Sequence, residues 1–124
     1  MTLLNINMLK ESGSYIGKPV KKQVEWQVKG KTLKADIYVK LSSYETTMEE
    51  FKFNAEGQNV LVARILASVC NEKGEPIFTL KDIEGDPETG EGKLCSSLFM
   101  ALVSAMNQAN GYSDEENEEV VEKK

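Results

Sequence analysis

Two segments of alternating apolar and polar residues, separated by a turn at Gly30, constrain the fold of this chain most strongly. Each segment places five side chains on one face of a strand: Val20, Lys22, Val24, Trp26 and Val28 in the first, and Leu33, Ala35, Ile37, Val39 and Leu41 in the second. Such a period of two is typical of strands with one packed face and one face in water. Residues 18–42 are therefore predicted to form a basic antiparallel β-hairpin that turns at Lys29-Gly30-Lys31.

A single hairpin is only marginally stable, so its apolar face needs a cover, and helices later in the chain are the obvious cover. Apolar spacing predicts helices over residues 43–53, 58–67 and 91–109. The second segment is apolar on nearly every side, so residues 58–70 also fit a buried strand. The predicted fold class is α+β, an N-terminal antiparallel β-hairpin packed on a small bundle of α-helices.

Local signals support the first and last of these helices. Ser42, followed three residues later by Glu45, resembles a helix N-cap. The first helix then places Tyr44, Met48 and Phe51 on one face. The last helix carries a wide apolar stripe and ends at Asn110-Gly111. This stripe consists of Leu94, Leu98, Leu102, Ala105 and Ala109, broadened by Cys95, Phe99, Val103 and Met106.

Between these helices, residues 68–78 could form a short hairpin around Glu72-Lys73-Gly74. Gly74 would take the positive φ of a tight turn, and Pro76-Ile77-Phe78 would return to the core. Thr79 with Asp82 then caps a brief helical turn.

The length of 124 residues is that of one domain. We expect a single α+β domain over residues 1–112, mainly helical from 43 to 111, and an acidic, disordered and flexible tail over 113–124. No apolar run approaches the roughly 20 residues needed to cross a bilayer, so no membrane association is expected. The first residues do not resemble a signal peptide, which indicates a cytoplasmic protein.

The residue types present argue against catalysis. The chain has no histidine, which removes Cys-His, Ser-His and His-metal sites. Cys70 and Cys95 lie in apolar runs and are expected to be small buried hydrophobes rather than nucleophiles. The segment GDPETGEG, residues 85–92, lacks the spacing of a calcium loop and is expected to be a solvated connection. We therefore predict no enzyme activity, no cofactor and no metal site.

Charge is unevenly distributed along the chain. Residues 1–43 hold eight lysines against three acidic residues, a net charge of +5, and residues 44–124 hold seven basic against seventeen acidic residues, a net charge of −10. The simpler interpretation is a solubilising surface. The alternative is that the basic end of one copy meets the acidic end of a neighbour or partner. Nucleic-acid binding is disfavoured by the negative total charge.

Three segments in this order resemble the short form of the tail assembly chaperones of long-tailed bacteriophages, the group related to the lambda and HK97 chaperones. They are a strand ending in IYVKLSSYE, the segment RILASVCNEKGEPIFTLKDI, and a helix leading into an acidic tail, LFMALVSAMNQANGYSDEE. The resemblance covers residues 36–124, and its motifs are structural rather than catalytic.

The resemblance implies a non-enzymatic function in the host cytoplasm. Members of the family bind the tape measure protein and keep it soluble during tail assembly. A longer form, made by ribosomal frameshifting near the end of the shorter reading frame, is implied to contact the tail tube protein. Lys123-Lys124 fits a slippery run of adenines. We also expect a homo-oligomer, because one small domain can cover only part of a long client.

Partner binding is assigned to the exposed edge of the last helix, at Phe99, Met100 and Met106, because methionine adapts to varied apolar partners. Each of these residues could instead belong to the core. The alternative function is that of a structural tail-completion or head-tail connector protein, in which the basic hairpin pairs with strands of a neighbour.

Overall fold

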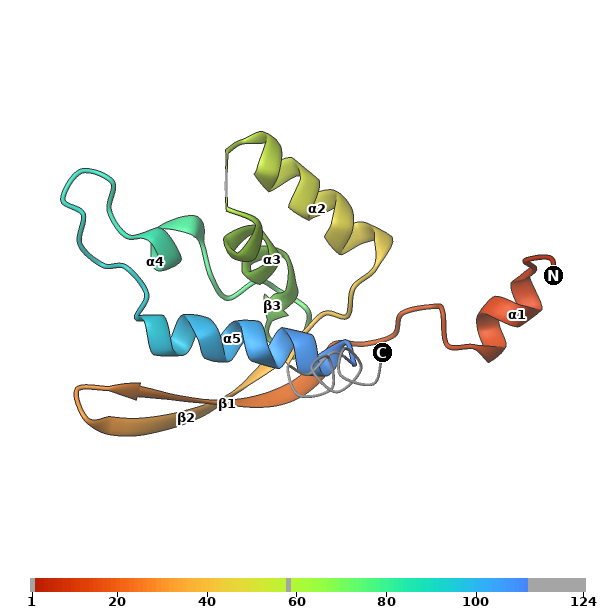
Figure 1. Cartoon of the computed structure of the whole chain (residues 1–124), viewed down its shortest axis with the longest axis horizontal. Helices are drawn as coiled ribbons and strands as arrows, with labels where there is room; N and C mark the ends of the chain where they lie inside the picture. Colours follow the sequence, from red (N-terminus) through yellow and green to blue (C-terminus); the bar gives the residue numbers. More distant parts are fainter. Residues whose placement is uncertain (1, 58, 112–124) are drawn as a thin grey trace, which may run out of the picture.

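The computed structural model describes residues 2–57 and 59–111 and has the predicted α+β architecture (Figure 1). In chain order its elements are α1 (Ile6–Glu11), β1 (Val20–Val28), β2 (Lys31–Val39), α2 (Tyr44–Ala55), α3 (Val60–Ser68), β3 (Val69–Cys70), α4 (Leu80–Glu84) and α5 (Ser96–Ala109). Within the described residues, no helix is long and apolar enough to span a bilayer.

The predicted hairpin forms in the expected register. β1 and β2 pair antiparallel from Val20 opposite Val39 to Val28 opposite Lys31, which leaves a two-residue turn at Lys29-Gly30. Both turn residues have positive φ, 51° and 79°, as hairpin turns of this length require. The alternation of side chains thus decided the pairing, because slipping by one residue would turn the apolar face to water.

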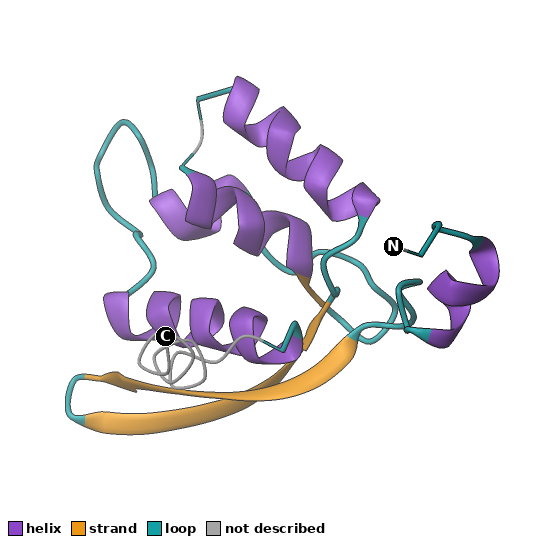
Figure 2. Cartoon of the chain, turned by 45° about the vertical axis from the view of Figure 1, so that its right-hand side comes forward, coloured by secondary structure: helices purple, strands orange, loops and turns teal. Residues whose placement is uncertain are grey.

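α5 packs along β1 and covers the apolar face of the hairpin (Figures 1 and 2). Val24, Ile37 and Val39 are buried there, and Trp26 is half-buried against the same core. The backbone N–H of Gln27 donates to Ser97 Oγ at 2.9 Å, which ties the distal part of β1 to the start of α5. The distal part of β2 stays exposed, so the predicted packed face is covered over only part of its length.

A third strand completes the sheet. β3 pairs antiparallel with β2 through Val39 opposite Val69 and Tyr38 opposite Cys70, so the strand order is β1-β2-β3. The predicted helix over 58–67 appears as α3, and the chain becomes extended directly after Ser68. Residues 58–70, whose sequence fitted either a helix or a buried strand, therefore contain both: a helix first and a short strand directly after it. Most of α3 is buried and contributes Val62, Ala63, Ile65, Leu66 and Ala67 to the core.

The chain reverses after β3 as predicted. The N–H of Asn71 donates to the carbonyl oxygen of Glu75 at 2.9 Å, and Gly74 has a φ of 84°. Phe78 packs against the core, but Pro76 and Ile77 are exposed, so their predicted return to the core is wrong. Neighbouring side chains of extended backbone point to opposite sides, so Ile77 faces away from the core when Phe78 faces toward it.

α5 begins five residues later than predicted, at Ser96 rather than residue 91. Gly90 and Gly92 have positive φ, which a helix does not accommodate, and the N–H of Leu94 donates to the carbonyl oxygen of Ile83 at 2.9 Å. The preceding α4 has the predicted cap, with Thr79 and Asp82 exchanging hydrogen bonds. α5 ends at Asn110-Gly111 as predicted.

α1 and the linker that follows it were not predicted. The helix stands away from the rest of the described chain (Figure 1), and within that part none of its residues is buried. The division into a 1–112 domain and a 113–124 tail stays a prediction, and that tail lies outside the described residues.

Candidate interaction surfaces

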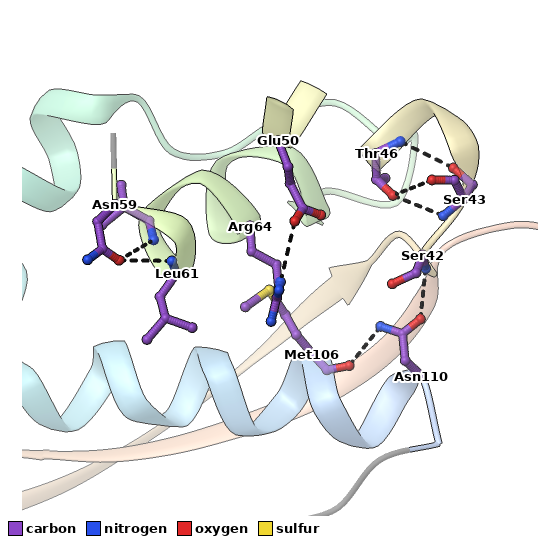
Figure 3. Close-up of polar contacts among 10 residues, drawn as sticks. Ser42, Ser43, Thr46, Glu50, Asn59, Leu61, Arg64, Met106 and Asn110 are labelled. Carbon is purple, nitrogen blue, oxygen red and sulfur yellow. Dashed lines mark hydrogen bonds and ion pairs between the residues drawn. The ribbon is translucent and has the colours of Figure 1, made fainter. Parts of the chain in front are cut away.

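A capping box fixes the start of α2 (Figure 3). The hydroxyl of Ser43 accepts from the N–H of Thr46 at 3.3 Å, and the N–H of Ser43 donates to Thr46 Oγ1 at 2.9 Å. The N-cap is therefore Ser43, one residue later than the predicted Ser42. Ser42 is engaged elsewhere, because its backbone N–H donates to Asn110 Oδ1 at 2.7 Å.

Two further contacts hold α2 in its orientation (Figure 3). The side chain of Asn110 also donates from Nδ2 to the carbonyl oxygen of Met106 at 2.9 Å, so it joins the end of α5 to the segment entering α2. On the neighbouring helix, Arg64 Nε lies 3.5 Å from Glu50 Oε1. These contacts turn the face of α2 that carries Thr46, which is buried, toward the rest of the domain.

The opposite face of α2 is apolar and points to solvent. Tyr44, Met48 and Phe51 are 84%, 59% and 62% exposed, and we name these three residues the α2 outer face. The sequence placed them on one side of a helix, and the structure leaves that side uncovered by the described residues. A set of adjacent exposed apolar side chains on a folded domain is typical of a surface that binds a partner.

A groove of about 900 Å³ lies beside the start of α2. Its walls come from the linker after α1, the β2–α2 connection, the first residues of α2 and the turn at Lys73-Gly74. Tyr15 and Ile16 of the linker line it together with Tyr44 of the α2 outer face, and all three side chains are exposed. The apolar surface of α2 thus continues into the linker.

A second apolar surface lies at the N-terminus. We name residues 2–19, which include α1 and its linker, the N-terminal arm. Leu3, Leu4 and Ile6 are strongly exposed, and Met8 and Leu9 are only half-buried. Asn5 is the N-cap of α1, and its side chain accepts from the N–H of Met8 at 2.9 Å.

The three residues predicted to bind a partner do not form one exposed patch. Met100 of α5 is 57% exposed and Phe99 is half-buried against the core. Met106 is only 2% exposed and belongs to the core itself. The structure therefore leaves Met100, with the adjacent edge of Phe99, accessible to a partner.

The two cysteines differ in environment. Cys70 is buried, and desolvation raises its pKa above the usual thiol value, although the charge of Lys40 and a hydrogen bond act in the opposite direction. A raised pKa reduces the thiolate fraction and hence nucleophilicity. Cys95 is exposed, so its predicted burial is wrong, because it lies in the extended segment before α5.

The described residues contain no group of three or more His, Cys, Asp or Glu side chains that could hold a metal ion. The acidic loop after α4 is instead organised by hydrogen bonds within the loop. Asp86 N–H donates to the carbonyl oxygen of Glu91 at 2.8 Å, and Asp86 Oδ1 accepts from the N–H of Glu88 at 2.8 Å.

Sequence reasoning missed both uncovered apolar surfaces as candidate binding sites. The five apolar residues within positions 3–9 were a usable signal for the N-terminal arm. The orientation of α2 had a weaker signal, since Thr46, Glu50 and Phe53 follow helical spacing as closely as Tyr44, Met48 and Phe51 do. Only the packing on α3 shows which face is covered.

Comparison with known proteins assigns a family to this arrangement. No curated protein and no solved structure gives a significant match. A family-wide sequence profile described as "Phage tail assembly chaperone, TAC" matches residues 7–110, which include every strand of the sheet and helices α2 to α5. Because this match extends over most of the chain, the protein belongs to the phage tail assembly chaperone family.

Proposed function

We propose that this protein binds the tape measure protein in the host cytoplasm and keeps it soluble while the tail assembles. The observation that carries the proposal is the family match over residues 7–110. It favours a chaperone over the alternative of a tail-completion or head-tail connector protein. The function needs no chemical step, so the protein would act by binding alone and without a cofactor.

The exposed apolar side chains give this activity a physical basis. A long helical client presents apolar residues along its length, and covering them removes the cause of its aggregation. The domain described here is small, and Met100 with the edge of Phe99 offers only a short contact. Several copies would therefore bind one client, and each copy would make the same contacts at a different position along it.

We assign the client contact on α5 to Met100 and the exposed edge of Phe99. Met100 has the flexible, polarisable side chain that suits varied apolar partners. Met106 would contribute indirectly, since it is buried and supports the helix from the core side. Substitution of Met106 would therefore report on folding rather than on client contact.

Co-expression with the tape measure protein from the same phage tests the function. The client should become soluble and co-purify with more than one copy of the chaperone. Met100→Asp should reduce co-purification at least several-fold, while Gln108→Asp, which adds the same charge at an exposed position of the same helix, should not. A tape measure protein that stays insoluble with the wild-type chain would refute the function. Equal effects of the two substitutions would refute the assigned surface.

Purified virions separate the chaperone from the connector. A chaperone leaves before the particle is complete, so mass spectrometry of mature particles should not detect this chain. Its presence there in stoichiometric amount would support the connector. The same measurement on assembling lysates would detect a longer, frameshifted form, which we propose contacts the tail tube protein.

A further inference from the structure

Two apolar surfaces of the described chain are left without a cover, and the groove lined by Tyr15, Ile16 and Tyr44 connects them. One is the N-terminal arm, with Leu3, Leu4 and Ile6 exposed. The other is the α2 outer face. α1 stands apart from the sheet and the other helices, and the two views agree on this (Figures 1 and 2).

The two surfaces complement each other in charge as well as in apolar character. The N-terminal arm carries Lys10 and Lys18 against one acid, Glu11. α2 and its C-cap carry one basic residue, Lys52, against four acidic residues, Glu45, Glu49, Glu50 and Glu56. Glu50 is engaged by Arg64, but the other three acids lie outside the ion pairs of the described residues. A positively charged arm is therefore attracted to the rim of the α2 outer face.

The dimensions of the arm fit such a contact. Residues 12–19 connect α1 to β1 and can span up to about 26 Å when extended. The 12-residue α2 is about 18 Å long. An arm of this reach can lay its apolar residues along the outer face of a neighbouring molecule while its own domain stays clear of that molecule.

We propose that the N-terminal arm of one copy docks on the α2 outer face of a second copy. This contact removes the apolar residues of the arm and those of the α2 outer face from water in one interface. The donor and acceptor surfaces differ, so the contact is heterologous, and the growing assembly keeps a free arm at one end and a free α2 outer face at the other. Repetition yields a chain or ring of copies.

This proposal can be tested without a client, so its failure and the failure of the proposed function are distinguishable. We would measure molar mass by light scattering after size-exclusion chromatography, over a range of protein concentrations. The arm variant is Leu3→Asp, Leu4→Asp and Ile6→Asp. The acceptor variant is Met48→Asp and Phe51→Asp. The matched control is Ile77→Asp, an exposed apolar residue outside both surfaces.

The wild type and the Ile77→Asp control should self-associate, and each of the other two variants should be monomeric. An equimolar mixture of the two variants should form a heterodimer, because one retains an intact arm and the other an intact α2 outer face. A mixture that stays monomeric would overturn the proposal, as would a wild type that is monomeric throughout. An arm that docks on its own α2 would produce this monomeric result.

Circular dichroism and thermal melting establish that both variants fold. If the acceptor variant melts below the wild type, Met48→Ser with Phe51→Ser replaces it. A disulfide test supplies an independent measurement in a Cys95→Ser background. Mild oxidation of an Ile6→Cys chain mixed with a Phe51→Cys chain should yield a covalent heterodimer, and absence of that product would contradict the proposed contact.

Discussion

At the residue scale, Gly85 shows how one backbone position shapes the loop between α4 and α5. It is buried, has a φ of 80°, and a Cβ built there would lie 2.5 Å from the carbonyl oxygen of Glu91. Both the conformation and the close approach exclude a side chain. Gly90 in the same loop has a φ of 73° but no atom within 4 Å of its virtual Cβ.

These two glycines form a matched pair for a stability measurement. Gly90→Ala should lower the free energy of unfolding by about 1–2 kcal/mol, the cost of a left-handed residue with a side chain. Gly85→Ala should cost about 3 kcal/mol or more, because overpacking against the Glu91 carbonyl is added to that strain. Urea denaturation of both variants provides the comparison, and equal losses would show that the loop relaxes to admit the methyl group.

At the element scale, the orientation of α2 depends on contacts at its ends and on one side. Ser43 and Thr46 close the N-terminus, and Glu50 pairs with Arg64. The shift of the N-cap from Ser42 to Ser43 has a clear cause, since the backbone of Ser42 is held by Asn110 at the end of α5. A contact between segments 68 residues apart thus competes with a local capping signal.

This assignment predicts different effects of two neighbouring substitutions. Ser43→Ala removes the side-chain acceptor of the capping box and should cost about 1 kcal/mol. Ser42→Ala keeps the backbone N–H that bonds Asn110 and should change stability by less than about 0.5 kcal/mol. Thermal melting with circular dichroism would measure both. A larger loss of stability for Ser42→Ala than for Ser43→Ala would show that Ser42 is the N-cap, as the sequence indicated.

At the scale of the whole molecule, the structure shows which elements carry the basic N-terminal and the acidic C-terminal charge. The basic residues lie mainly in the N-terminal arm and the hairpin, and acidic residues gather on α2 and in the loop after α4. Lys21 pairs with Asp36 at 3.5 Å within the hairpin, but both side chains are at least half-exposed, so this pair contributes little. Most of the charge is therefore available to neighbouring molecules.

Salt should weaken the proposed self-association without abolishing it. Raising ionic strength from about 0.1 M to about 1 M shortens the Debye length from about 10 Å to about 3 Å, which screens the attraction between the arm and α2. The apolar contact is retained. Sedimentation velocity should therefore show a Kd that rises several-fold with salt. A Kd independent of salt would mean that the charges on the two surfaces do not face each other.

Much of the local structure could be predicted from the residues alone. The alternation around Gly30 determined the hairpin and its register, and Asn110-Gly111 determined where α5 ends. Thr79 and Asp82 determined the cap of α4. These features depend on interactions between residues that are close in sequence or directly paired across a tight turn. A short stretch of sequence therefore contains all the residues that determine each of these features.

Only the tertiary structure decided what depends on distant segments. Three features depend on such segments. β3 pairs with β2, and Met106 is buried while Met100 is exposed. The third is the outward orientation of Tyr44, Met48 and Phe51. An apolar face has the same spacing whether it packs in the core or meets solvent, because periodicity records which residues share a side and not what lies opposite. The covered side of α2 was decided by packing against α3 and the core, where Thr46 is buried, Glu50 pairs with Arg64 and Phe53 lies against the core cluster.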